Sequence, residues 1–143
     1  MAIDSLDEKL INLLMQDAHK SSEVLAKQLD VSSSTVRRRL KKLVKSGIIN
    51  IIAIPEPSKI GLPLEAIIAF DVDHESLNST IEILKKQPQV RWVAATSGRF
   101  DIMVYAWFSS TDNLYYFIES EIGGLEGLKS TETFICLHVA KHP

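Results

Sequence analysis

The chain has 143 residues, 45% of them hydrophobic and 24% charged, which is typical of a folded globular protein with one domain or two small ones. Its net charge of −2 is unevenly divided: residues 1–50 hold nine Lys and Arg against six Asp and Glu (+3), and residues 51–143 hold seven against twelve (−5). No apolar run reaches the ~20 residues of a membrane span and the N-terminus is acidic rather than basic, so the sequence argues against a membrane protein and a signal peptide.

The first fifty residues have the apolar periodicity of three helices. The first is predicted over residues 5–18, with Ser5 and Glu8 as an S-x-x-E capping box. The second is predicted over 21–30. The third begins at an N-cap, Ser32, and ends at Gly47. The short break between the last two helices indicates a helix-turn-helix.

Residues 48–54 form a continuous β-branched run, which favours a strand. Prolines at 55, 57 and 63 and a glycine at 61 then interrupt regular structure. We therefore predict a winged-type helix-turn-helix domain over 1–50, a strand and linker over 51–63, and a second domain over 64–143.

The second domain alternates strands and helices. Strands are predicted over 64–72, 90–97, 100–108 and 131–140, and helices over 75–86 and 110–122. A tight turn at Gly98-Arg99 joins the two middle strands. The order βαββαβ predicts a ferredoxin-like domain and an α+β protein.

Both faces of this sheet are predicted to be apolar. In the first strand Ile68 and Phe70 lie on one face, yet Ile67 and Ala69 lie on the other. The last two strands show the same pattern. Because the helices of a ferredoxin-like domain cover only one face, the other needs a second cover. A second subunit is the simplest one, and we expect a symmetric homodimer.

Residues 31–46 hold six basic residues and no acidic one. At 100° per residue, Val36, Leu40 and Leu43 share one helical face, and basic and hydroxyl side chains share the opposite one. The second helix of a helix-turn-helix presents such a face to the major groove of DNA. The alternative is a solvated basic helix without a ligand. The predicted residues for contact with double-stranded DNA are Ser32, Ser33, Ser34, Thr35, Arg37, Arg38, Arg39, Lys41, Lys42 and Lys45.

Short motifs lie along the whole chain: Leu6-Asp7, Ile11-Leu14, Leu25-Ala26, Val31-Ser32-x-Ser34-Thr35-Val36, Arg39-Leu40-x-x-Leu43-x-x-x-Gly47-x-Ile49, Gly61 and Gly98-x-Phe100-Asp101. Together they resemble the Lrp/AsnC, or feast/famine, family of transcriptional regulators. This resemblance implies a homodimer or an octamer whose second domain binds an amino acid or a related small metabolite between subunits. The effector-binding residues that it implies are Gly98, Arg99, Asp101, Thr131 and Thr133.

Some of these positions have a simpler interpretation. Asp101 can accept hydrogen bonds from a ligand ammonium, or it can hold backbone amides of its own turn. Arg99 stands where the family often has an acidic residue, so the resemblance does not name the effector. Asp30 stands where many helix-turn-helix proteins have Gly, and Asp tolerates the conformation required there.

Two other classes of function remain as alternatives. Some proteins with this two-domain build decarboxylate siroheme-type tetrapyrroles, but His19, His74, His138 and His142 have no metal-ligand spacing. We expect neither an enzyme nor a cofactor or metal. A metabolite-sensing module without DNA binding would lack the basic helix.

The single cysteine, Cys136, excludes an intrachain disulfide and suits a cytoplasmic protein.

Overall fold

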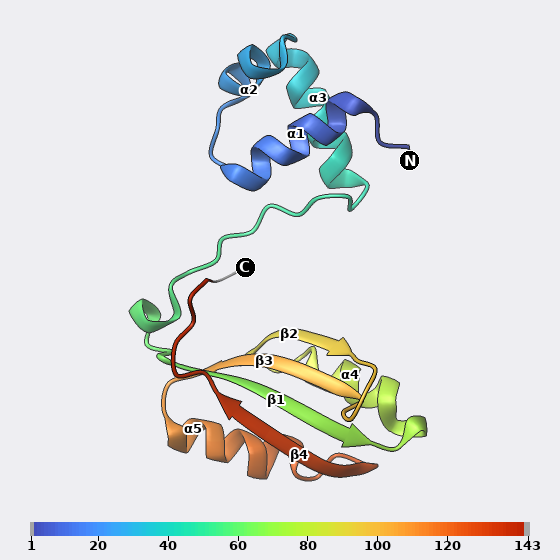
Figure 1. The fold of residues 1–143 in the computed structure, drawn as a ribbon, viewed down its shortest axis with the longest axis vertical. Coiled ribbons are helices and arrows are strands. Elements are labelled where there is room, and N and C mark those ends of the chain that lie inside the picture. Colours follow the sequence, from blue (N-terminus) through green and yellow to red (C-terminus); the bar gives the residue numbers. More distant parts are fainter. Residues whose placement is uncertain (1, 142–143) are drawn as a thin grey trace. The chain divides into compact units, whose positions relative to one another are not determined.

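The structure is a computed structural model that describes residues 2–141, so His142 lies outside the described residues. The chain divides between Ile54 and Pro55 into two compact units, which are described separately (Figure 1). The first unit holds three helices, and the second holds a four-stranded sheet with its helices. Over residues 2–141 no helix is long and apolar enough to cross a membrane.

The helices of the first unit are α1 (Ser5–Gln16), α2 (Ser22–Leu29) and α3 (Ser33–Lys45). The hydroxyls of Ser21 and Ser32 cap α2 and α3 by accepting backbone N–H groups of the first turn. The Ser32 cap is as predicted. The three helices therefore form the predicted helix-turn-helix arrangement.

The cap of α1 corrects the predicted capping box of Ser5 and Glu8. Asp4 is the N-cap, and its carboxylate accepts hydrogen bonds from the amides of Leu6 and Asp7. Asp7 completes the box by accepting from the Asp4 amide. Asp and Ser are about equally good N-caps. Asp4 also forms an ion pair with Arg39 of α3, and this tertiary contact favours the helix start that Asp4 caps.

The core of the first unit is made by the apolar faces of the three helices. Leu10, Leu25, Val36 and Leu43 are each no more than 1% exposed. Asp30 ends α2 in the left-handed conformation, with φ 53°, as its place in the turn requires. The core therefore fixes which face of α3 points inward.

The predicted strand over residues 48–54 is wrong. The structure has no strand there, and Ile51, Ile52 and Ile54 are 54%, 72% and 46% exposed. A strand requires a hydrogen-bonded neighbour, and in the described chain this segment has no paired strand. The β-branched composition of the segment favours an extended backbone but does not provide a neighbouring strand.

The second unit contains β1 (Leu64–Val72), α4 (Leu77–Leu84), β2 (Val90–Ala95), β3 (Ile102–Phe108), α5 (Thr111–Tyr116) and β4 (Leu128–Ile135). α5 continues in one π-helical turn to Ile122. The strands are antiparallel in the order β2-β3-β1-β4. This is the predicted βαββαβ arrangement.

Several predicted ends are corrected by the sheet. β4 ends at Ile135, not at 140, because the antiparallel β1 begins nearly opposite this point and the last hydrogen bond runs from the Cys136 amide to the Glu65 carbonyl. Leu137 beyond it is 98% exposed. The connection between β2 and β3 extends over residues 96–101, longer than a two-residue turn. α4 is shorter than predicted, with a 3₁₀ turn before it.

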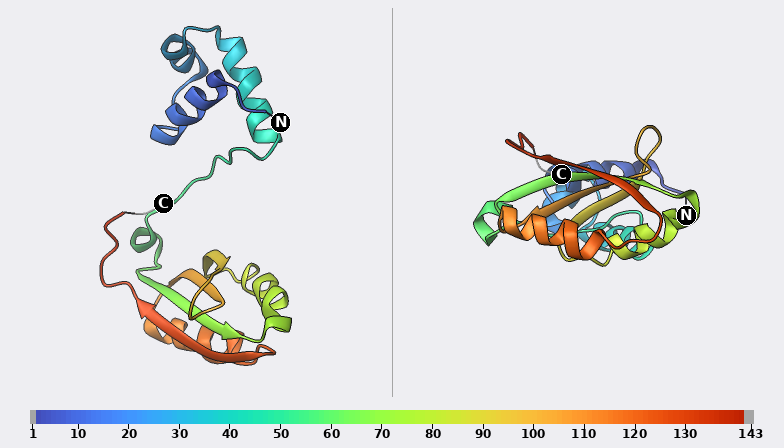
Figure 2. Two further views of the ribbon diagram at one scale, coloured as in Figure 1. Left: turned by 45° about the vertical axis from the view of Figure 1, so that its right-hand side comes forward. Right: turned by 90° about the horizontal axis from the view of Figure 1, so that it is seen from below.

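The two faces of the sheet differ in their cover. α4 and α5 lie on the same face (Figure 2), where Ile68, Phe70 and Val104 are fully buried. By the strand register, the opposite face carries the side chains of Ile67, Ala69, Trp92, Met103, Tyr105 and Phe134. We call this the open face. Both faces are apolar, as predicted.

Candidate nucleic-acid interface and effector turn

The N-terminus of α3 presents a cluster of hydroxyl groups. The Ser32 Oγ accepts from the Thr35 amide at 3.2 Å and lies 2.9 Å from both the Ser34 Oγ and the Thr35 Oγ1. Ser32 and Ser34 are exposed. A helix N-terminus with free amides and small hydroxyl side chains suits contact with a phosphate or a base edge.

Four basic side chains along α3 are exposed and uncommitted. Within residues 2–141, Arg38, Lys41, Lys42 and Lys45 form no ion pair or side-chain hydrogen bond. Val36 and Leu43 are buried on the other side of the helix, and Leu40 is half-buried. The four cations therefore project away from the core, where a polyanion can reach them.

Arg39 is one of the predicted DNA-binding residues, but its contacts lie within the domain. Its Nη1 is 2.5 Å from Asp4 Oδ2 and 3.1 Å from both carboxylate oxygens of Asp7. The side chains of Arg39 and Asp7 are 22% and 3% exposed. Two carboxylates thus neutralise this guanidinium and tie α3 to α1.

This ion pair shifts the ionisation of its members. The backbone amide of Asp7, followed by the Arg39 guanidinium, lowers the pKa of Asp4. The Asp4 carboxylate in turn raises the pKa of Arg39. Both shifts favour the charged pair at neutral pH.

Arg37 is partly engaged. Its Nη1 lies 3.0 Å from Glu23 Oε1 of α2, and its Nη2 donates to the Ser33 Oγ at 3.3 Å. Both Arg37 and Glu23 are more than half exposed. This weak surface pair can exchange for a phosphate. Sequence reasoning missed the acidic partners Asp4, Asp7 and Glu23, because the helical pattern does not show which carboxylates face α3.

The connection between β2 and β3 is fixed by its own hydrogen bonds. Gly98 has φ 122°, which glycine adopts readily. The Asp101 carboxylate accepts from the Val72 amide at 3.0 Å, and the Thr96 hydroxyl donates to the Phe100 carbonyl at 2.7 Å. Asp101 therefore holds the backbone amide of Val72 in β1, and not the amides of its own turn that the sequence predicted.

Arg99 is exposed at this turn and lies over the Phe100 ring, 5.1 Å from its centroid. It also faces Glu132 of β4 across 3.9 Å. Glu132 pairs with Ala69 and so lies on the open face, whereas Thr131 and Thr133 pair with residues of the covered face. The structure brings Arg99 of this turn near Glu132, which the sequence did not indicate, and places Thr131 and Thr133 on the other face of the sheet.

Comparison with known proteins settles the family. A winged helix-turn-helix DNA-binding model matches residues 3–50, and the Lrp/AsnC ligand-binding domain matches residues 65–143. The chain belongs to the Lrp/AsnC family. An HTH-type transcriptional regulator of Pyrococcus furiosus is 35% identical over 97% of this chain and 95% of its own length. This Lrp/AsnC protein is thus a DNA-binding transcriptional regulator with a ligand-binding domain, and the family is not one of enzymes.

Solved structures of similar proteins share the fold. Escherichia coli AsnC is 27% identical with a TM-score of 0.86, and the match covers 100% of this chain and 97% of AsnC. A transcriptional regulator of Neisseria meningitidis, solved as a complex with L-Met, is 23% identical with a TM-score of 0.88. That match covers 99% of this Lrp/AsnC chain and 94% of the other.

Proposed function

We propose that this regulator binds DNA as a homodimer, or as a larger assembly up to an octamer, with one α3 helix in each of two successive major grooves. The observation that carries the proposal is the row of four exposed, unpaired cations on the outer face of α3. Two such helices related by a two-fold axis match a partly palindromic site.

The contacts of α3 divide its side chains by role. Ser34, Thr35 and Arg38 stand toward its N-terminal end and are the proposed base readers, since Arg pairs with guanine in bidentate fashion. Lys41, Lys42 and Lys45 are the proposed phosphate anchors. Ser32, Ser33 and Arg37 lie where they can add phosphate contacts. Arg39 is assigned a structural role because Asp4 and Asp7 hold it.

Self-association is proposed through the open face. Trp92 and Phe134 are 51% and 46% exposed there, and exposed apolar surface of this kind favours a second subunit. On this face the Tyr105 hydroxyl donates a hydrogen bond to the Glu65 carboxylate. A two-fold partner would bury apolar side chains of both copies at once.

The proposed domain division places DNA contact in residues 1–50, a linker in 51–63, and effector binding and self-association in 64–143. We propose that the effector is an amino acid or a related metabolite bound at residues 98–101. The named ligand-binding domain and the L-Met complex of the Neisseria regulator support this class. The free Cys136 thiol suits work in a reducing cytoplasm.

The DNA-binding proposal is tested with the full chain and DNA fragments selected from a random pool. Wild type should enrich a partly palindromic sequence, and its affinity should fall steeply with salt. A triple variant, Arg38→Ala, Lys41→Ala and Lys45→Ala, should lose both properties while keeping its thermal unfolding temperature. Equal binding by wild type and the triple variant would refute the role of α3.

The effector proposal is tested separately by thermal shift with each amino acid. A ligand at 100 times its Kd stabilises the folded state by about 2.7 kcal/mol. The unfolding temperature should rise with at least one amino acid, and the rise should shrink in Asp101→Ala. The absence of any response would remove amino-acid sensing and leave DNA binding intact.

A further inference from the structure

We propose that Glu23 of α2 is a specificity-determining residue of the DNA interface, which positions Arg37 for one DNA phosphate and repels a backbone that lies in any other register. The inference rests on the proposed placement of α3 in the major groove. It adds an acidic residue of α2 to an interface that is otherwise made of cations and hydroxyl groups of α3.

The Arg37 side chain is held by one partner from each of the two helices. Its Nη1 lies 3.0 Å from Glu23 Oε1 of α2, and its Nη2 donates to the Ser33 Oγ of α3 at 3.3 Å. A guanidinium carries its N–H donors in a rigid planar fork, so contacts at both terminal nitrogens fix its plane as well as its position. The side chain is still 57% exposed. A further acceptor can therefore approach it from the solvent side.

Glu23 brings a negative charge to the same place. The carboxyl lies in the first turn of α2 and its side chain is 63% exposed. Its own backbone amide, followed by the Ser21 hydroxyl and the Arg37 guanidinium, lowers the pKa of Glu23. The carboxylate is therefore ionised at neutral pH, and a DNA backbone that reaches Arg37 also comes close to it.

Arg37 lies among the residues proposed to contact DNA. Residues three and four apart are neighbours on a helix surface, so Arg37 stands next to Ser34 on one side and Lys41 on the other. Among the five exposed cations of α3, Arg37 alone has a carboxylate partner within residues 2–141. Glu23 thus stands at the edge of the cationic row and affects one defined member of it.

A carboxylate in this position acts differently on target and on other DNA. Binding without sequence preference depends on cations and phosphates alone, so Glu23 weakens it by neutralising one cation and repelling phosphates. In a specific complex, phosphate contacts fix the register and orientation of the protein. A phosphate on the open side of Arg37 gains a charge-assisted hydrogen bond while the pair with Glu23 is kept. A shifted backbone meets the carboxylate instead, and such repulsion of the wrong partner raises specificity.

The experiment measures binding of the full chain to the selected DNA fragment and to a scrambled version of it, by fluorescence anisotropy at several salt concentrations. Glu23→Gln keeps the size of the side chain and removes its charge. It should tighten binding to the scrambled DNA about two- to fivefold, as expected for one exposed charge pair, and steepen the salt dependence. It should not tighten binding to the selected fragment, because the gain in charge is offset by the lost position of Arg37. Discrimination should therefore fall about two- to fivefold.

A double variant assigns the effect to Arg37. Arg37→Ala alone should reduce discrimination. In that background Glu23→Gln should change discrimination no further, because no guanidinium remains to be positioned. Thermal unfolding of each variant checks that the helix-turn-helix is intact.

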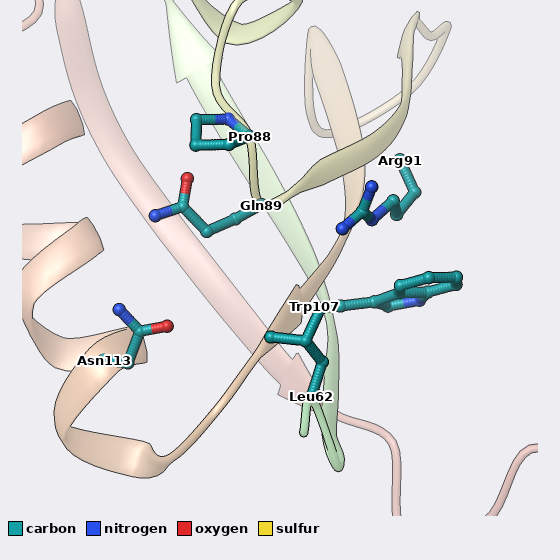
Figure 3. Close-up of a pocket in the computed structure, with 6 residues that line it drawn as sticks. All are labelled: Leu62, Pro88, Gln89, Arg91, Trp107 and Asn113. Carbon is teal, nitrogen blue, oxygen red and sulfur yellow. The ribbon is translucent and has the colours of Figure 1, made fainter. Parts of the chain in front are cut away.

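Two controls separate this effect from the loss of a charge elsewhere. Glu8→Gln removes the same charge from an exposed position of α1 and should affect both DNAs alike. Arg91→Gln removes an exposed arginine of the second unit, whose guanidinium carbon lies 4.5 Å from the centroid of the Trp107 ring (Figure 3). It should leave discrimination unchanged.

Equal tightening of both DNAs by Glu23→Gln, or no change in either, would overturn the proposal, since Glu23 would then be only a surface charge. An effect of Glu23→Gln on discrimination that persists in Arg37→Ala would overturn it as well. The triple variant of Arg38, Lys41 and Lys45 leaves Glu23 and Arg37 in place. Failure of the Glu23 prediction therefore leaves the proposed function standing, whereas full DNA binding by the triple variant would overturn both.

Discussion

The Nη1 atom of Arg39 lies 3.1 Å from both carboxylate oxygens of Asp7, a residue that is only 2% exposed. This contact joins the proposed recognition helix to α1. The neighbouring Arg38 is exposed and forms no ion pair within residues 2–141. Two adjacent arginines of one helix therefore differ: Arg39 is bound within the fold, and Arg38 is free for the proposed contact with DNA.

Arg39→Ala should lower the unfolding temperature of the first unit by several degrees, because it leaves the buried Asp7 carboxylate unpaired. Arg38→Ala is the matched control and should unfold at the wild-type temperature. Circular dichroism of both variants and the wild type provides the measurement. Equal unfolding temperatures for the two variants would contradict a structural role for Arg39.

Arg38→Ala should instead reduce discrimination between the selected site and a scrambled one by about 1–3 kcal/mol, the energy of one base contact. Lys41→Ala should weaken binding to both sites equally and lower the slope of log affinity against log salt by about one. Fluorescence anisotropy at several salt concentrations measures both effects. If Lys41→Ala altered specificity and Arg38→Ala did not, the two assigned roles would be reversed.

The pH dependence of the first unit should reflect Asp4, whose folded-state pKa lies below its ordinary value. A depressed pKa means that the carboxylate stabilises the fold fully above its unfolded pKa, and that this contribution is lost as the pH falls through the folded pKa. Urea unfolding should therefore show declining stability below about pH 4.

Asp4→Asn is the variant that isolates this charge. Its side-chain oxygen can still cap α1, but it cannot form the ion pair with Arg39. At pH 7 Asp4→Asn should be less stable than wild type, and the difference should narrow at low pH. A constant difference across the pH range would show that the cap alone is responsible.

Gly127→Ala should destabilise the second unit by about 1–3 kcal/mol. Gly127 has φ 75°, and a β-carbon there would collide with the hydroxyl of Ser76. Gly124→Ala is the control, since a β-carbon at that position meets no atom within 4 Å. Chemical denaturation compares the two. Tolerance of Gly127→Ala would mean that the Ser76 turn rearranges at no cost.

Phe134→Glu should dissociate the proposed dimer, because it places a charge on the open face. Ile83→Glu is a matched control on α4, where Ile83 is 40% exposed on the other side of the sheet. Analytical ultracentrifugation should detect a smaller species for Phe134→Glu only. An unchanged sedimentation coefficient would move the interface away from the open face.

Much of the fold could be predicted from the sequence, because local patterns carry it. Apolar spacing placed α1, α2 and α3, and alternation with turn residues placed the βαββαβ order. The predictions failed where an element depends on a partner. Residues 48–54 have strand composition but no neighbouring strand among the described residues, and β4 ends near the point where β1 begins.

The site divides in the same way. The sequence by itself determined that α3 has a basic face opposite an apolar one, since both follow from the helical repeat. Only the tertiary structure decided which cations remain free, because Glu23 lies 14 residues from Arg37, and Asp7 and Asp4 lie 32 and 35 residues from Arg39. It likewise placed Glu132 beside Arg99 and turned Thr131 to the covered face, because strand register is set by pairing between distant segments.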